Sequence, residues 1–425
     1  MSGRCTIAAA ALAAAAVVGF AASALAQPVA IVGGKVYPVS GPPMENATIL
    51  IDNGAIKEVG ANVSIPAGAT RIDAKGKWVT PGLIYAASGL GVVEIGAVPE
   101  ANDASAKGDR SVAASFRVWE GLNPSTVLWE PARNEGVTSV VVAPGGRNLI
   151  SGQAAIVDLS DGSRSDMVRR APVAMFGQLG SAAGAGASAR GELVQRFREL
   201  IGDVRAFASR RDAYEAGNSR DLSARRADLE AMIPVVEGRL PLVLAVDRAA
   251  DIEMALDLAR ELNLKIAILG GAEAWKVSSR LASEKVAVLT GGLDNIPSSF
   301  ASLGQRQENA GLLAKAGVPL AILGSPGEAF NVRNIRQEAG SAVAYGLGWD
   351  AALRAVTLTV AEQFGVADRV GSLQPGRDAN VVVWSGDPFE FATVAEHVFV
   401  KGRAVKRPSR QDELTEKYKR LLKPQ

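Results

Sequence analysis

The sequence predicts an α/β protein, a (β/α)8 TIM-type barrel with a small composite β-sandwich domain built from the two terminal segments. Eight short apolar runs alternate with helical patterns between residues 81 and 372. Most of these runs are continuous rather than alternating, which is typical of strands buried on both faces of a parallel sheet. Segments rich in β-type residues and Gly-containing turns occur at both ends of the chain and not in the middle. A doubly wound open sheet is the alternative arrangement for the eight central runs.

The first 26 residues have the pattern of a secretory signal peptide. Arg4 precedes an apolar run over residues 7–20 and a small-residue site at residues 24–26. This pattern predicts cleavage between Ala26 and Gln27 and a periplasmic or secreted protein, with an uncleaved membrane anchor as the alternative. Cys5 is the only cysteine and precedes the cleavage site, so the mature chain would contain no disulfide. No later stretch of the sequence is long and apolar enough to predict a membrane span.

The terminal segments are predicted to share one small β domain, formed by residues 28–80 and 373–407. Asn53-Gly54 between two alternating apolar runs is a strong signal for a two-residue hairpin turn. Residues 81–372 would then form the barrel, and residues 408–425 a helical tail. Within the barrel segment, residues 251–262 place apolar side chains on one helical face, as expected for a helix that covers a sheet. Residues 190–235 predict two charged helices that either cover the barrel or project from it.

The ionisable residues exclude several kinds of catalytic site. The formal net charge is +2 without a basic cluster, so no nucleic-acid partner is predicted. The only histidine, His397, lies in the predicted terminal β domain, and no lysine occurs between Lys107 and Lys265. A site with several histidines, a Ser triad that uses histidine, or a carboxylated lysine on the fourth or fifth strand is therefore excluded. An all-carboxylate site for Mg, Ca or Mn remains as an alternative, but only Asp158 and Asp247 are acids at the ends of the eight runs. Two acids alone are not expected to hold a catalytic metal, so no metal or other cofactor is predicted.

Several longer motifs together resemble one family. They are "GGKVYPVSG…NATILIDNGAIKEVG" near the start, "GKWVTPGLI" before the first barrel run, and "RVGSLQPGRDANVVVWSGDP" near the end. In this order they resemble the amidohydrolase superfamily, in its imidazolonepropionase-like branch of metal-dependent hydrolases. The resemblance covers the chain after residue 26. It implies a barrel with a composite β domain, and an active site at the carboxyl ends of the barrel strands.

The resemblance also implies positions for the metal ligands, and each position carries a different residue here. The family has Pro-Gly-Leu-Ile-Asp-Ala-His-x-His on its first strand, where this chain has Tyr85 for Asp and Ala87 and Gly89 for the histidines. The remaining positions match Val173 for the strand-4 lysine, Ala245 and Asp247 on strand 5, Gly270 on strand 6, and Pro326 for the strand-8 aspartate. The chain is therefore identified as a degenerate member that lacks the metal-ligand histidines.

These features predict a catalytically inactive, metal-free pseudoenzyme that acts by binding. Its ligand would be a small peptide or amide in the old cleft, or an active amidohydrolase relative in a hetero-oligomer; a homo-oligomer is also possible. The residues predicted to line the cleft are Tyr85, Gln153, Asp247, Arg248 and Asp294, each of which could instead make a structural polar contact. The alternative is an active hydrolase of carbon–nitrogen bonds with an atypical site, in which Asp247 and Asp294 would be the acids.

Overall fold

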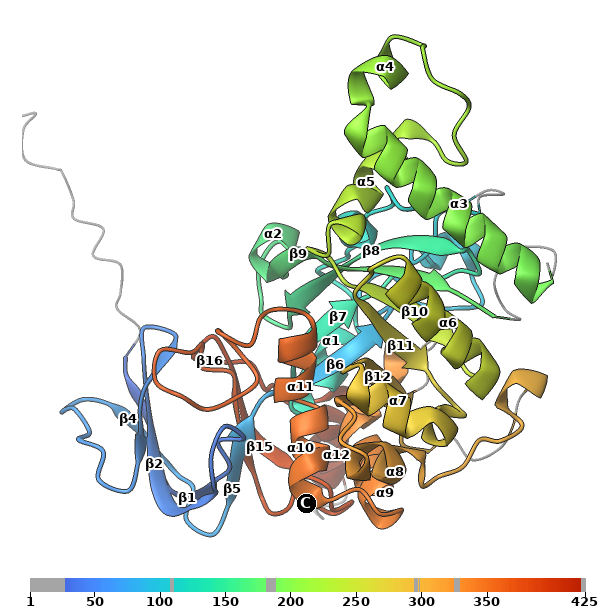
Figure 1. The fold of residues 1–425 in the computed structure, drawn as a ribbon. Helices are drawn as coiled ribbons and strands as arrows, with labels where there is room; N and C mark the ends of the chain where they lie inside the picture. Colours follow the sequence, from blue (N-terminus) through green and yellow to red (C-terminus); the bar gives the residue numbers. More distant parts are fainter. Residues whose placement is uncertain are drawn as a thin grey trace, which may run out of the picture.

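The computed structural model describes residues 27–107, 111–180, 189–293, 297, 299–324 and 329–421 (Figure 1). The predicted signal peptide and the site positions Asp294 and Pro326 lie outside these described residues. Among the described helices, none combines the length and the apolar character that a membrane crossing would need.

The central part of the chain forms one eight-stranded sheet that curves into a barrel. Its strands follow one another in chain order, and the first and last strands, β6 and β13, also contact each other, so that the barrel is nearly closed. The prediction of an α/β fold with an eight-stranded barrel is confirmed, and the strand order does not reverse as a doubly wound sheet requires. The strands are β6 (Leu83–Ser88), β7 (Val137–Val142), β8 (Ile150–Asp158), β9 (Val168–Gln178), β10 (Leu242–Val246), β11 (Ile266–Gly270), β12 (Ala287–Gly291) and β13 (Leu320–Leu323).

One strand departs from the predicted regular (β/α)8 pattern. β8 runs antiparallel to both β7 and β9, whereas the other neighbouring pairs are parallel. The reason is the connection between β7 and β8, residues 143–149, which contains no helix. A parallel connection needs a crossover of roughly a dozen residues or more, so this short loop can only reverse the chain. Asp158, at the end of β8, therefore lies at the opposite end of the barrel from the ends of the other strands.

Strands from both ends of the chain join in a second sheet. β5 pairs with β14, so the N-terminal and C-terminal segments share one structure as predicted. The two facing layers of a sandwich are not confirmed, because the strands form a single connected sheet in which β1 pairs with β2, β4 and β5. Its strands are β1 (Val29–Val36), β2 (Met44–Asp52), β3 (Ala55–Gly60), β4 (Thr70–Asp73), β5 (Trp78–Pro81), β14 (Val381–Trp384), β15 (Ala395–Val400) and β16 (Arg403–Ala404).

β14 connects the cores of the two sheets. Its side chains alternate in direction, so that Val381 and Val383 are buried within the terminal sheet, while Val382 and Trp384 belong to the barrel core. The Trp384 indole N–H donates a hydrogen bond to Thr80 Oγ1 at 2.8 Å. The terminal sheet is therefore packed against the barrel through one strand that is buried on both faces.

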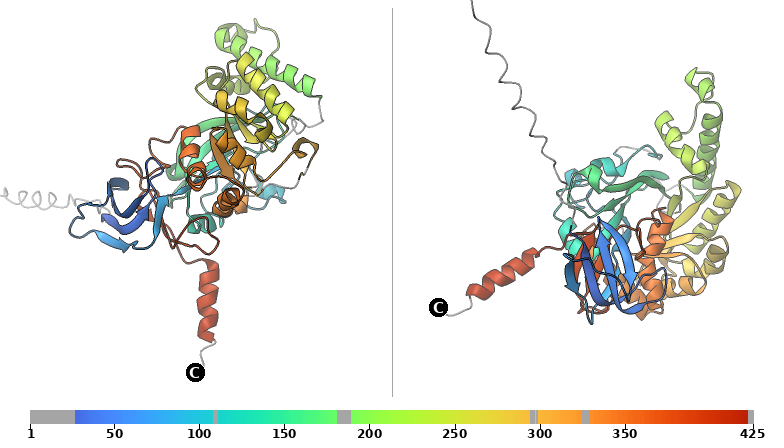
Figure 2. Two further views of the ribbon diagram at one scale, coloured as in Figure 1. Left: turned by 60° about the horizontal axis from the view of Figure 1, so that its bottom comes forward. Right: turned by 90° about the vertical axis from the view of Figure 1, so that its left-hand side faces the viewer.

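Helices surround the barrel, and two groups extend from it. α3 and α5 contact each other and, with α4, stand out from the barrel (Figure 1), while the C-terminal helix α12 points away from the body (Figure 2). The α-helices are α1 (Trp129–Asn134), α2 (Arg164–Met167), α3 (Arg190–Ser209), α4 (Arg211–Glu215), α5 (Arg226–Val236), α6 (Ala249–Glu261), α7 (Ser278–Ser283), α8 (Asn309–Lys315), α9 (Ile335–Ala344), α10 (Trp349–Ala355), α11 (Leu358–Gln363) and α12 (Arg410–Leu421). Short 3-10 helices are η1 (Pro99–Ala101), η2 (Val118–Gly121), η3 (Ala274–Val277), η4 (Phe300–Ser302) and η5 (Ala329–Asn334).

Candidate functional site

A cavity of about 290 Å³ lies at the carboxyl ends of β6, β9, β10 and β11, and we call it the mouth cavity. In (β/α)8 barrels this end carries the active site. Among the residues that the structure describes, none that lines the mouth cavity has an ionisable side chain. They are Ala87, Ser88, Gly89, Val93, Asn102, Ala104, Ser105, Ala143, Pro144, Gly145, Gly146, Ser151, Phe176, Gly177, Gln178, Ala245 and Leu269.

Gln178 is one of the polar residues that line the mouth cavity. It ends β9 and pairs with Ala245 of β10, which in turn pairs with Leu269 of β11, so that these three residues form one row. The Gln178 side-chain Nε2 donates to the carbonyl of Gly146 at 2.7 Å, while its Oε1 is buried without a hydrogen-bond partner among the described residues. A buried acceptor left unpaired costs about 1–3 kcal/mol, so this oxygen is a candidate acceptor for a hydrogen-bond donor.

Gln178 was missed from the sequence because the strand-4 position was assigned to Val173. Val173 lies in the middle of β9 and lines a different cavity at the opposite end of the barrel. The register with Ala245 identifies Gln178 as the β9 residue at the mouth. Its place as the last residue of the apolar run "PVAMFGQ" was the available signal.

Ala87 and Gly89, at the end of β6, both line the mouth cavity. A Cβ atom added to Gly89 would lie 2.8 Å from Cγ2 of Val93, so a side chain at position 89 would have to displace Val93. Of the positions that the resemblance assigns to metal ligands, Ala87, Gly89 and Ala245 therefore surround the cavity, and none of them supplies a donor side chain.

Asp247 and Gly270 face each other just beyond the mouth cavity. Oδ1 of Asp247 accepts a hydrogen bond from the backbone N–H of Ala272 at 3.3 Å. A Cβ atom on Gly270 would lie 2.5 Å from the same oxygen, and the φ angle of Gly270 is +88°. The Asp247 carboxylate thus occupies the space of a side chain at position 270, and neither residue lines the cavity.

Tyr85 is buried beside the mouth cavity without lining it. Its hydroxyl accepts a hydrogen bond from the backbone N–H of Gly324 at 2.9 Å, which ties β6 to the end of β13. Oε2 of Glu338 accepts in the same way from the N–H of Gly292 at 3.2 Å, at the end of β12. The oxygen atoms of Tyr85 and Glu338 therefore accept hydrogen bonds from backbone N–H groups at the ends of the strands.

The remaining predicted residues are separate from the cavity. Gln153 is buried, and its Nε2 donates to the carbonyl of Ala114 at 3.0 Å, a structural contact. Arg248 is exposed at the start of α6, and neither residue lines the mouth cavity. His397 lies in β15 of the terminal sheet, where burial and the nearby Lys77 hold its pKa below the ordinary value. Asp294 lies outside the described residues.

Acids near the mouth do not gather into a metal site. Glu273 follows β11 and binds the backbone N–H groups of Ala249 and Gly304 at 3.1 and 2.7 Å, and also the ammonium group of Lys276 at 2.9 Å. Within the part of the chain that the structure describes, no three His, Cys, Asp or Glu side chains lie close enough to hold a metal ion together.

Comparison with known proteins links the chain to one family. The family model "Amidohydrolase family" matches residues 246–405. The chain is 23% identical over 389 residues to the Amidohydrolase tasK of Hapsidospora irregularis, across 84% of this chain and 39% of that protein. It is 34% identical over 137 residues to the Dihydroorotase of Geobacter sulfurreducens, across 32% of this chain and 31% of that protein. The chain thus spans less than two fifths of the length of these curated relatives.

The structural comparison agrees with the sequence comparison. A solved structure of an amidohydrolase from Thermotoga maritima MSB8 superposes with a TM-score of 0.81 at 27% identity. The similarity covers 89% of this chain and 100% of that chain, so it includes both the barrel and the terminal sheet.

Proposed function

The chain belongs to the amidohydrolase superfamily, and from this premise we propose that its mouth cavity binds a small uncharged amide without metal-dependent hydrolysis. The observation that carries the proposal is the lining of the cavity. Among the described residues it contains no ionisable side chain, and it includes Gln178, whose buried Oε1 has no hydrogen-bond partner among those residues.

The family implies a divalent metal at this end of the barrel, and the described residues do not fit one. Divalent metals in proteins are held mainly by imidazole, thiolate or carboxylate groups, and amide or backbone carbonyl oxygens add to such ligands in calcium sites. Ala87, Gly89 and Ala245 have no donor atom in their side chains, and Asp247 is directed at the backbone of residue 272 instead of the cavity. No step through a metal is therefore derived.

The cavity favours a compact and neutral ligand. About 290 Å³ has room for roughly ten water molecules at about 30 Å³ each, which corresponds to a capped amino acid or a small cyclic amide. A charged ligand would lose its hydration without gaining a counter-charge, and that loss is costly in a buried site. An amide N–H would instead satisfy Oε1 of Gln178, while hydroxyl groups such as those of Ser105 and Ser151 could bind its carbonyl.

The test compares a neutral and a charged ligand of nearly equal size. Isothermal titration calorimetry of the full chain with N-acetylglycinamide and with N-acetylglycinate should show at least tenfold tighter binding of the neutral compound. Gln178→Met should abolish this binding because it removes the amide oxygen. The matched control, Gln363→Met, changes a glutamine at the opposite end of the barrel and should leave it unchanged. Equal affinities for both compounds, or full affinity in the Gln178 variant, would contradict the proposal.

A second candidate is hydrolysis of a carbon–nitrogen bond through an atypical site. It is favoured by the relatives, which are named as an amidohydrolase and a dihydroorotase. Mass spectrometry of the purified chain for Zn, Mn and Fe, together with hydrolysis assays on an amide panel, separates the two candidates. Stoichiometric metal, with hydrolysis that Asp247→Asn or Asp294→Asn removes, would establish this candidate and overturn the first.

A further inference from the structure

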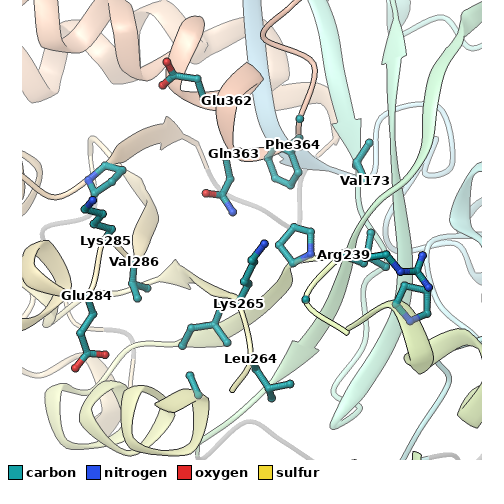
Figure 3. Close-up of a pocket in the computed structure, with 18 of the residues that line it drawn as sticks. Val173, Arg239, Leu264, Lys265, Glu284, Lys285, Val286, Glu362, Gln363 and Phe364 are labelled. Atoms are coloured by element: carbon teal, nitrogen blue, oxygen red, sulfur yellow. The ribbon is translucent and has the colours of Figure 1, made fainter. Parts of the chain in front are cut away.

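A second and larger cavity lies at the other end of the barrel, where β10, β11, β12 and β13 begin (Figure 3). Its volume is about 990 Å³, and we call it the basal cavity. The ends of α5, α6 and α11 form its remaining walls. This end of such barrels usually carries residues that stabilise the fold, so a charged side chain here is expected to have a partner within the protein.

The basal cavity has an excess of positive charge. Five cationic and two anionic side chains line it. The two anionic ones are paired with arginines that do not line the cavity, Glu284 with Arg280 at 2.8 Å and Glu362 with Arg354 at 2.7 Å. Figure 3 shows both carboxylates turned away from the open space. The acids therefore do not neutralise the cations of the cavity.

The cationic side chains fall into two groups. Three have partners in the protein: Arg170 donates to the carbonyl of Gly365, Arg239 pairs with Glu237, and Arg260 pairs with Asp257 at 2.9 Å. Lys265 and Lys285 make no side-chain hydrogen bond or ion pair with any residue in the ranges that the structure describes. Two ammonium groups thus line the cavity without a partner among the described residues.

Helix dipoles do not remove this excess. The C-terminal ends of α5, α6, α7 and α11 lie beside the cavity, and a long helix carries about half a negative elementary charge at its C-terminus. Four such ends offset about two charges at most, and α7 and α11 are too short to carry the full value. The formal excess among the lining side chains is three positive charges, so the cavity stays positive.

Besides the charged side chains and the polar Asn263, Thr359 and Gln363, the lining of the basal cavity contains apolar side chains, which suggests a ligand with an apolar part. Val173, Val286 and Phe364 line the cavity, and Lys265 and Gln363 point toward each other across its open space (Figure 3). We propose that the basal cavity binds an organic anion, whose charged group is held by Lys265 and Lys285 and whose apolar part lies against Val173, Val286 and Phe364. This site is separate from the mouth cavity, and the proposal stands independently of the function assigned to the mouth.

The test uses three probes that divide the ligand into its parts. Phenyl phosphate carries both the anionic and the apolar part, inorganic phosphate carries only the first, and phenol only the second. Isothermal titration calorimetry of the full chain should rank phenyl phosphate above inorganic phosphate, with phenol weakest. Affinity for phenyl phosphate should fall with added NaCl, because ion pairs at exposed lysines are screened by salt.

Substitution of the lysines tests the assignment of the charged group. Lys265→Gln and Lys285→Gln should each weaken phenyl phosphate binding about threefold to fivefold, the range for exposed ion pairs, and the double variant about tenfold or more. The matched control, Arg260→Gln, removes a cation of the same cavity that already has a partner, and should change affinity less than twofold. Thermal unfolding of each variant checks that the fold is kept. Unchanged affinity in the double variant, or equal binding of phenol and phenyl phosphate, would overturn the proposal.

Discussion

The two ends of the barrel differ in size and in charge. The mouth cavity is small and has no ionisable residue in its described lining, while the basal cavity is more than three times larger and positively charged. Ionisable side chains do occur near the mouth, but Asp247, Glu273 and Glu338 accept hydrogen bonds from backbone N–H groups. The difference teaches that a cavity's charge depends on where side chains direct their polar atoms as much as on which residues are nearby.

The basal end itself contains two kinds of charged group. Besides the exposed lysines of the cavity, a buried network joins the barrel to the terminal sheet. Arg169 binds Asp158 at 2.9 Å and Asp378 at 2.6 Å, and all three side chains are almost fully buried. Lys401 also pairs with Asp158 at 2.9 Å. The four predictions that follow test which charged and polar groups support the fold, from the largest expected effect to the smallest.

The largest effect is expected at the buried network. Arg169→Met should lower the free energy of unfolding by about 3–5 kcal/mol, because two buried carboxylates lose their shared cation. Arg260→Met is the control at the same end, where an exposed ion pair contributes about 1 kcal/mol or less. Urea denaturation of both variants measures the difference. If both variants lost a similar amount of unfolding free energy, the buried ion pairs of Arg169 would contribute no more to stability than the exposed ion pair of Arg260.

The next effect concerns the space at the mouth. Gly270→His should cost about 2–3 kcal/mol, because position 270 has a φ of +88° and the new Cβ would meet the Asp247 carboxylate. Gly317→His is the matched control, since Gly317 has a φ of +84° and no heavy atom near the Cβ position, and it should cost about 1–2 kcal/mol. Denaturant unfolding measures both values. If the Gly270 variant were as stable as the control, the mouth would have room for a metal-ligand histidine at position 270.

A smaller effect is expected at Tyr85. Tyr85→Phe should lower the free energy of unfolding by about 1–3 kcal/mol, because the buried N–H of Gly324 loses its acceptor. Tyr345→Phe, at a tyrosine that is 41% exposed, should change stability by less than about 0.5 kcal/mol. Binding of N-acetylglycinamide should survive in the Tyr85 variant, since Tyr85 does not line the mouth cavity. Loss of binding without loss of stability would instead assign Tyr85 to the ligand.

The fold could largely be predicted from the sequence, apart from the direction of one strand. A continuous apolar stretch identifies a buried strand but not its direction, so the sequence of β8 looks like that of its parallel neighbours. The direction of β8 follows from the length of the loop at residues 143–149, and the pattern of apolar stretches contains no information on loop length. The pairing of the two terminal segments was predictable because both carry strand patterns and turn residues that the middle of the chain lacks.

The candidate site was harder to predict, for a geometric reason. Polar and charged residues near the strand ends were selected, yet Tyr85 and Gln153 use their polar atoms on the backbone. The mouth is instead lined by small residues such as Ala87 and by Gln178. Which side chain faces a cavity depends on strand register: the end of the run "PVAMFGQ" pointed to Gln178, and its pairing with Ala245 placed it at the mouth.

The smallest of the four effects tests the acid that borders the mouth, Glu273. Burial raises its pKa, but hydrogen bonds from Ala249 and Gly304 and the ion pair with Lys276 outweigh burial and hold the pKa below the ordinary value of 4.5. The carboxylate therefore stabilises the fold fully above pH 4.5, and this contribution is lost as the pH falls through the lowered pKa. Glu273→Gln should cost about 1–2 kcal/mol at pH 7, because an amide cannot accept at both of its ends.

Unfolding measured from pH 7 to pH 3 should show a constant gap between the parent and the Glu273 variant down to about pH 5 and a shrinking gap below it. Glu284→Gln, at an acid of the basal cavity with a partly exposed ion pair, should cost less than about 1 kcal/mol at pH 7. If the Glu273 gap stayed constant to pH 3, the ionised form of Glu273 would not be what holds the loops around the mouth. Hydrogen bonds from backbone N–H groups to Glu273 would then not explain why this acid is kept out of the lining of the mouth cavity.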